Sequence, residues 1–376
     1  MDEQEGPALN RRSVLTAAGV LVGAGVLVVV TLPDQPGTEA ERTSATPSSS
    51  APGLPGRPDG GEDCPVRELL AEPDAAVVSV AFGEDGSRAA LWESGARHAL
   101  VIDAEDDSQH RELLDEAGAL ARVPGGYLVG RGARLRVVAP DGTATPITTS
   151  VEPVVPAAGD VVVDIEGSAW LYRAADAALH RPASPRKGSL TNGWVTPEGA
   201  LVTTTQVRPG DGPVERAVWR GGRWELSRIA APGALPGDVI GNGSRIAVVV
   251  REGAPSSALV VHVSPDAGAS WRSVSLAELE LSGHGSAAVT RGGDVLVADG
   301  DGAVVRVPLD GSPERLGDAP ELTRLTASGP RVWGRDHRRP AARLRWTDDA
   351  GRTWHAVPPP GAGSAESRPR GGGGRF

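Results

Sequence analysis

Between positions 64 and 360, the hydrophobic residues fall in short runs separated by turns rich in glycine and aspartate. Short apolar runs bounded by such residues predict β-strands rather than helices. One order recurs: two apolar runs around a Gly turn, a short gap, a third strand, an Asp–Gly type of turn and a closing strand. The step from third to fourth strand is clearest at residues 98–103, 134–143, 169–176, 217–224, 259–271, 303–312 and 344–354. The pattern predicts seven repeats of a four-stranded unit.

The length of the repeat indicates the fold. Asp266 and Asp349 occupy the same place in two repeats and lie 83 residues apart, with the Asp310-Gly311 turn near the midpoint. One repeat is therefore about 41 residues, and β-propeller repeats run about 40–50 residues with four strands per blade. We predict an all-β, seven-bladed β-propeller; six or eight blades also fit, because the early repeats are weak. A β-sandwich is the alternative, but it needs no fixed period.

The composition suits many short strands joined by tight turns. The chain has 50 glycines and 32 prolines, and its nine tryptophans far outnumber its two Phe and two Tyr. Each blade of a propeller buries both faces against its neighbours, so inner strands can consist almost entirely of small and branched apolar residues. Residues 161–163 and 247–250 are predicted to be strands of this kind.

Two of the turns share a longer pattern, Ser/Thr-x-Asp-x-Gly-x-x-Trp. Its positions are Ser264, Asp266, Gly268 and Trp271 in the first copy, and Thr347, Asp349, Gly351, Thr353 and Trp354 in the second. Each copy follows an apolar run and leads into another, which predicts a hairpin. Asp is expected to accept hydrogen bonds from N–H groups of the turn, Gly to adopt positive φ, and Trp to fold back as an apolar plug.

This pattern resembles the Asp-box, or bacterial neuraminidase repeat, of sialidase-type and sortilin-type β-propellers. The resemblance implies that Asp266 and Asp349 stabilise turns on the rim, away from the central funnel. In a propeller, Trp271 and Trp354 are expected to fill gaps between blades near the outer rim. The resemblance implies a fold, and it does not by itself imply an activity.

The N-terminus contains an export or anchoring segment. Arg11 and Arg12 precede an apolar run that extends to Leu32. This arrangement resembles a twin-arginine export signal, with Asn10 and Val14 departing from the usual pattern. A simple signal anchor is the alternative, since residues 13–32 are long enough to cross a bilayer as a helix. The arginines before the run and the acidic residues after it favour a cytosolic N-terminus and an extracytoplasmic C-terminal domain.

Five segments follow from this pattern. They are a cytosolic N-terminus (1–12), a transmembrane or signal segment (13–32), a disordered Pro/Ser/Gly linker (33–63), the propeller (64–360) and a disordered Gly/Arg tail (361–376). No small-x-small cleavage site adjoins the apolar run, which favours a retained membrane anchor over a cleaved signal. In both interpretations the propeller lies outside the cytoplasm, either on the membrane or secreted.

Charge and cysteine content restrict the partners. The formal net charge of −10 argues against nucleic-acid binding, which needs clustered Lys and Arg. Cys64 is the only cysteine, so no internal disulfide can form, and we expect a plain unpaired thiol. The partners expected are an unknown protein or glycan ligand, with the membrane contacted through the N-terminal segment.

The residues needed for sialidase chemistry are not evident. Sialidases require three arginines for the substrate carboxylate and a Tyr nucleophile with a Glu partner. The early Arg-Ile-Pro motif that usually supplies the first arginine is absent, and the only tyrosines are Tyr127 and Tyr172, both in strand-like contexts. A glycoside hydrolase that uses two carboxylates leaves no local motif, so it stays open as an alternative. We predict no catalytic residue and no cofactor.

Two other clusters have simpler interpretations. The Asp299-Gly-Asp301-Gly302 stretch departs from a calcium-binding loop and is predicted to be a polar hairpin turn. The seven histidines are not spaced as metal ligands, and no metal site is predicted. Arg335 and the charged residues after it are expected in a solvated loop of the last repeat, with an anion site in the funnel as the alternative. We therefore favour a non-catalytic binding or scaffolding module over an enzyme.

Overall fold

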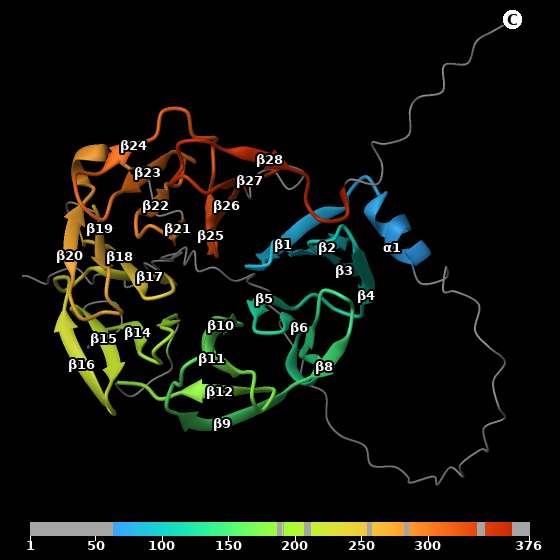
Figure 1. Ribbon diagram of the computed structural model, residues 1–376, viewed down its shortest axis with the longest axis horizontal. Helices are drawn as coiled ribbons and strands as arrows, with labels where there is room; N and C mark the ends of the chain where they lie inside the picture. Colours follow the sequence, from blue (N-terminus) through green and yellow to red (C-terminus); the bar gives the residue numbers. More distant parts are fainter. Residues whose placement is uncertain are drawn as a thin grey trace, which may run out of the picture.

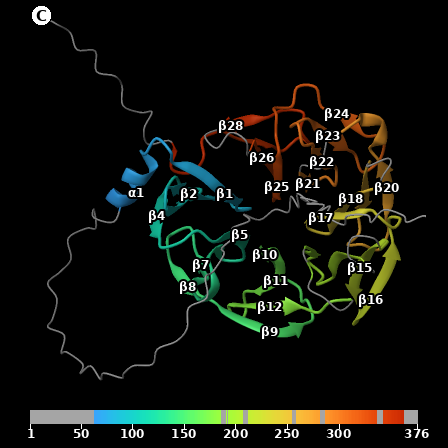
Figure 2. The ribbon, with the colours of Figure 1, turned by 180° about the vertical axis from the view of Figure 1, so that it is seen from behind.

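The computed structural model describes residues 63–185, 190, 192–206, 212–253, 258–281, 286–336 and 343–362. These residues form seven four-stranded sheets arranged in a ring, and the predicted all-β, seven-bladed β-propeller is confirmed (Figures 1 and 2). The predicted export or anchor segment, with Arg11 and Arg12, lies outside the described residues. Within the described ranges, no helix combines the length and the apolar character needed to span a membrane.

The blades are numbered in chain order. Blade 1 consists of β1 (Ala76–Phe82), β2 (Arg88–Ser94), β3 (Arg97–Asp103) and β4 (Gln109–Leu114). Blade 2 consists of β5 (Ala119–Val123), β6 (Gly126–Gly130), β7 (Arg136–Val138) and β8 (Ala144–Pro146). Blade 3 consists of β9 (Thr148–Val154), β10 (Val161–Ile165), β11 (Ser168–Arg173) and β12 (Ala178–Pro182). Blade 4 consists of β13 (Trp194–Val195), β14 (Leu201–Gln206), β15 (Val214–Arg220) and β16 (Arg223–Arg228).

The second half of the ring has the same design. Blade 5 consists of β17 (Leu235–Asn242), β18 (Arg245–Arg251), β19 (Leu259–Ser264) and β20 (Arg272–Ser275). Blade 6 consists of β21 (Ser286–Val289), β22 (Val295–Ala298), β23 (Val304–Val307) and β24 (Glu314–Arg315). Blade 7 consists of β25 (Arg324–Ser328), β26 (Arg331–Arg335), β27 (Leu344–Thr347) and β28 (His355–Val357). Among the described residues, the helical segments are α1 (Asp63–Leu70) and two 3₁₀ turns, η1 (Gly132–Arg134) and η2 (Ala277–Leu279).

Blade 3 departs from the predicted repeat. Six blades have their four strands in chain order, but in blade 3 the outermost strand is β9, which precedes the other three and pairs parallel with β12. Figure 1 shows β9 on the outer rim of the ring. The segment 169–176, expected to hold a third strand, contains β11, which is the second strand of its sheet. The repeat pattern in the sequence places the outermost strand of each blade after the third strand in the chain. In blade 3 the outermost strand precedes the other three, so that pattern could not locate it.

Apolar layers between neighbouring blades form the core. In β18 the five residues between the terminal arginines are all buried, as the apolar pattern of residues 247–250 predicted. Strand β10 is less buried than the sequence suggested, since Val163 is its one buried residue. Residues on both faces of β18 are buried, as expected for an inner strand that packs between two neighbouring blades.

The ring closes between blades 7 and 1 through side chains. Both blades are built from consecutive strands, so among the described strands none from one chain end joins the sheet of the other. The Phe82 ring stacks on Trp333 with centroids 4.4 Å apart, and Trp333 also contacts Trp346. Arg335 donates to the carbonyl oxygens of Val77 (3.3 Å) and Val78 (3.1 Å). Arg335 therefore joins two blades, and the prediction that it lies in a solvated loop is wrong.

A short segment after β28 reinforces this closure from outside. The indole N–H of Trp92 donates to the carbonyl oxygen of Pro360 (2.8 Å), and Ala362 packs on the apolar cluster shared by α1 and blade 1. In Figure 1 the chain after β28 runs beside β1 and α1. The two ends of the described region therefore meet at the outer side of blade 1.

Candidate functional site

The first Asp turn, residues 264–271, connects β19 to β20 in blade 5. Ser264 Oγ donates to Asp266 Oδ1 (3.0 Å) and accepts from the N–H of Gly268 (2.8 Å). Ser270 donates to Asp266 twice, through its N–H (2.7 Å) and its hydroxyl (2.6 Å). The Trp271 indole N–H donates to the carbonyl oxygen of Gly268 (2.9 Å). One carboxylate thus holds both ends of the turn.

The second Asp turn, residues 347–354, connects β27 to β28 in blade 7 and repeats the hydrogen bonds of the carboxylate and the hydroxyl groups. Thr347 Oγ1 donates to Asp349 Oδ1 (2.8 Å) and accepts from the N–H of Gly351 (3.0 Å). Thr353 donates to Asp349 through its N–H (2.9 Å) and its hydroxyl (2.6 Å). Two turns with the same sequence pattern therefore share the bonding of their carboxylate, at the same strand junction of two blades. They differ at the tryptophan, since the indole N–H of Trp354 has no hydrogen-bond partner among the described residues.

Both turns pack against the preceding blade. Trp271 lies on the cluster that contains Val202 of blade 4, and Trp354 lies on the cluster that contains Leu296 of blade 6. Gly351 has φ of +85°, and a Cβ there would come within 2.6 Å of a Leu316 side-chain carbon. Positive φ and close approach together require glycine at this position.

The carboxyl groups of Asp266 and Asp349 are held in the ionised form by the hydrogen bonds of their turns. Burial alone would raise the pKa of Asp349, but hydrogen bonds from Thr353 and Thr347 lower it to about 2. Hydrogen bonds from Ser270 and Ser264 likewise outweigh burial and lower the pKa of Asp266. A carboxyl group that stays ionised and saturated with donors is suited to holding a turn, and a general acid needs the opposite shift.

We expect Asp349→Ala to lower the free energy of unfolding by about 1–3 kcal/mol, because several donors lose their acceptor at once. The measurement is denaturant unfolding of the purified full chain. Asp348→Ala is the matched control, since Asp348 is the exposed neighbour of Asp349 in the same turn. Equal stabilities of the two variants would contradict the role assigned to Asp349.

A second type of turn, five residues long, recurs along the chain. That these turns share one hydrogen-bond pattern was not recognised from the sequence. It occurs at residues 83–87, 104–108, 139–143, 196–200, 290–294 and 299–303. In each, the first N–H donates to the fifth carbonyl, the fourth N–H donates to the first carbonyl, and the fourth residue has positive φ. The Asp-Gly pairs at Asp85 and Asp141 were the available signal.

The suspected calcium loop is one of these turns. Asp299 is 2% exposed, and its carboxylate accepts from the N–H groups of Asp301 and Ala303 (both 2.9 Å). Within the described part of the chain, no group of three or more His, Cys, Asp and Glu side chains is arranged to hold a metal ion. The interpretation of this stretch as a polar hairpin turn agrees with the geometry.

The two tyrosines are buried. Tyr127 in β6 is fully inaccessible, its hydroxyl is 2.7 Å from Ser87 Oγ, and burial raises its pKa to about 12. Tyr172 in β11 is 4% exposed, and burial raises its pKa as well. A tyrosine nucleophile needs access to substrate and an activated hydroxyl. Neither side chain has these properties.

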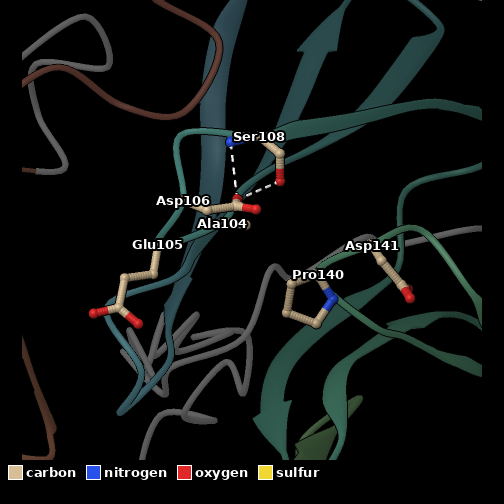
Figure 3. Close-up of a pocket in the computed structure, with 6 residues that line it drawn as sticks. All are labelled: Ala104, Glu105, Asp106, Ser108, Pro140 and Asp141. Atoms are coloured by element: carbon tan, nitrogen blue, oxygen red, sulfur yellow. Dashed lines mark hydrogen bonds between the residues drawn. The ribbon is translucent and has the colours of Figure 1, made fainter.

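An open cavity of about 410 Å³ lies between the third-to-fourth strand turns of blades 1 and 2. Its lining comprises Ala104, Glu105, Asp106, Ser108, Pro140 and Asp141 (Figure 3). Ser108 donates to Asp106 through both its N–H (3.0 Å) and its hydroxyl (2.5 Å). Hydrogen bonds from Ser108 lower the pKa of Asp106, and those from Thr143 lower the pKa of Asp141. The cavity is acidic, and its two aspartates are held as ions.

Asp164 on the innermost strand of blade 3 differs from these groups. Burial raises its pKa, while N–H donation from Gly167 (2.8 Å) and from Ser168 opposes the rise. Neighbouring charges do not contribute to the shift. A glycoside hydrolase of the two-carboxylate type needs a general acid with a raised pKa and an ionised carboxylate close to it. Asp164 has the first property alone.

Comparison with known proteins identifies a fold and no family. No protein-family model matches the sequence, and no curated protein does. The structure is similar to the β-propeller domain of the trilobed protease of Pyrococcus furiosus, which has an open velcro topology. The TM-score is 0.51 at 12% identity, covering 75% of this chain and 97% of that chain.

Two further propellers are more distant. Kluyveromyces lactis Hsv2 gives a TM-score of 0.46 at 10% identity, covering 76% of this chain and 98% of that chain. A mutant of Aleuria aurantia lectin in complex with α-methyl-L-fucoside gives 0.39 at 14% identity, covering 77% and 99%. At these identities the likeness concerns the fold alone.

Proposed function

We propose that this protein is a non-catalytic β-propeller of the Asp-box class that binds or scaffolds a protein or glycan ligand at the cell surface. The observation that supports this proposal is the state of its reactive groups. Asp266 and Asp349 are saturated with donors from their own turns, and Tyr127 is buried on Ser87. Groups committed to structure in this way are not available for bond-breaking chemistry.

The rival function is an exported glycoside hydrolase that uses two carboxylates. Such enzymes place a carboxylic acid with a raised pKa beside an ionised partner. In the acidic cavity of blades 1 and 2, Asp106 and Asp141 are both shifted toward ionisation. Asp164, whose pKa is raised, owes that shift to burial and not to a neighbouring carboxylate. These shifts favour the binding module over the hydrolase.

We expect the purified full chain to hydrolyse neither fluorogenic sialosides nor a panel of neutral glycosides. The physical reason is that neither tyrosine is accessible and no acid–base pair has divergent pKa values at the cavity. Sialoside turnover that disappears in Tyr127→Phe or Tyr172→Phe would overturn the proposal. Turnover of a neutral glycoside that disappears in Asp164→Asn would favour the rival hydrolase.

We also propose that the propeller is extracytoplasmic. This rests on the apolar segment 13–32, with Arg11 and Arg12 before it and acidic residues after it. We expect a reporter that is active only outside the cytoplasm to work when fused after Phe376. Replacing Arg11 and Arg12 together by lysine should block export if the twin-arginine route is used. Unchanged export of that variant would indicate an ordinary anchor, and a reporter active only in the cytoplasm would disprove the location.

A further inference from the structure

The layer between blades 4 and 5 is mostly apolar. Its buried members are Val202, Val214, Val218, Ala234, Val239, Ile246, Val248 and Val250. At one level, however, three polar residues interrupt this packing. Thr204 on β14 lies directly opposite Arg216 on β15, and His262 comes from β19 on the facing blade. Thr204 and His262 are 6% and 5% exposed, so this polar group is enclosed by the two blades.

One residue of the first Asp turn covers this group. The guanidinium of Arg216 lies over the Trp271 ring, 4.1 Å from its centroid. Across the β19–β20 pair, the Ser273 hydroxyl is 2.7 Å from Nδ1 of His262. The polar group is therefore bounded by Trp271 on one side and by two strands of each blade on the others.

Three buried polar atoms of this group have no hydrogen-bond partner among the residues that the structure describes. They are Oγ1 of Thr204, Nε of Arg216 and Nε2 of His262. An unpaired buried polar atom costs about 1–3 kcal/mol, so three at one level between two blades need an explanation.

The chemistry of these atoms indicates what is missing. Arg216 Nε can only donate, and the Thr204 hydroxyl is able to donate. We assign to His262 the tautomer in which Nδ1 accepts from the Ser273 hydroxyl, and in that tautomer Nε2 carries the ring proton and donates too. The charge points the same way, because burial lowers the pKa of Arg216 to about 10 and no carboxylate among the described residues offsets this effect. These three donors, one of them on a half-buried cation, lack an acceptor with negative charge.

We propose that a small inorganic anion of about the size of chloride binds between blades 4 and 5, held by Thr204 Oγ1, Arg216 Nε and His262 Nε2. The anion neutralises the guanidinium and gives all three donors an acceptor. It contacts both blades and lies behind Trp271, so it stabilises the first Asp turn together with the interface.

Binding of the anion is coupled to protonation of His262. Arg216 is the charged group that faces His262 across the layer, while β14, β18 and β20 contribute Thr204, Val248 and Ser273. Without an anion, burial and then the charge of Arg216 disfavour the imidazolium form. A bound anion offsets both effects, so the affinity for the anion rises as the pH falls.

The test is thermal unfolding of the full chain at constant ionic strength, while sodium gluconate is replaced by sodium chloride. We expect a saturable rise in Tm of about 2–4 °C at a tenfold excess over the dissociation constant, and a larger rise at pH 5 than at pH 7. Chloride-35 NMR line broadening that is reversed by bromide measures binding directly. An unchanged Tm together with an unbroadened chloride signal would overturn the proposal.

Three variants separate this site from general salt effects. Arg216→Leu should abolish the chloride response, and the isosteric Thr204→Val should weaken it at least tenfold while keeping the fold. Arg331→Leu is the matched control, since Arg331 also lies over a tryptophan, 4.4 Å from the Trp346 ring centroid, in blade 7. A chloride response that persists in both Thr204→Val and Arg216→Leu would disprove the site.

Discussion

Trp333→Ala is expected to lower the free energy of unfolding by about 3–5 kcal/mol, because it removes a large buried ring from a tightly packed site. Trp333 is 4% exposed on β26. Its ring lies nearly parallel to that of Phe82, at an angle of 7°, and 6.3 Å from the ring of Trp346. The stacking of Trp333 on Phe82 joins the last blade to the first, and no exchanged strand in the described chain supports it. The loss should therefore fall on the closure of the ring.

Denaturant unfolding of the full chain measures this effect. Trp224→Ala is the comparison, since Trp224 is only partly buried on the outermost strand of blade 4, where it contacts Trp219 and packs on the cluster shared with blade 3. Loss of a partly buried ring on an outermost strand should cost clearly less than loss of the buried Trp333 ring. If Trp333→Ala were no more destabilising than Trp224→Ala, the aromatic contacts would not be what closes the ring.

The fold class could be predicted because its signals are local. A period of about 41 residues, Asp-Gly turns and short apolar runs each depend on neighbouring residues in the chain. The two Asp turns are local in the same sense: Asp266 and Ser270, or Asp349 and Thr353, lie within one turn of chain. For this reason their hydrogen bonds follow the pattern that the sequence indicated.

The parts that the sequence did not predict depend on distant residues. Strand β9 pairs with β12 although β10 and β11 lie between them in the sequence, and Arg335 reaches β1 from the other end of the described chain. Helix α1 was not expected, because its apolar side is satisfied only by blade 1 and by Ala362. Contacts between residues so far apart in the chain produce no repeating sequence pattern from which they could be predicted.

The polar group between blades 4 and 5 was missed for a related reason. Thr204, Arg216 and His262 lie on three different strands, and each looks ordinary within its own apolar run. Their meeting depends on the strand register of two blades, in which Thr204 opposes Arg216 and Val248 opposes His262. Register is fixed by the pairing of whole strands, so it could not be inferred from the spacing of these residues.

The buried imidazole of His262 leads to the second large prediction, which concerns stability against pH. Burial, and then the positive charge of Arg216, lower the pKa of His262 to about 4. In the unfolded chain a histidine titrates near 6.5, so between these two values the unfolded state binds a proton that the folded state excludes. The stabilising contribution is therefore complete above about pH 6.5 and is lost as the pH falls toward 4.

We expect the free energy of unfolding in chloride-free buffer to fall by about 3 kcal/mol from this group alone between pH 6.5 and pH 4. His262→Gln should remove that slope even if it also lowers stability at pH 7, because the slope reports the proton and not the packing. His180→Gln is the control, since His180 on β12 of blade 3 pairs with the half-exposed Asp176 (3.1 Å), away from the layer between blades 4 and 5. A slope that is unchanged in His262→Gln would show that the proton is taken up elsewhere. A slope removed equally by His180→Gln would show that it is not specific to the layer between blades 4 and 5.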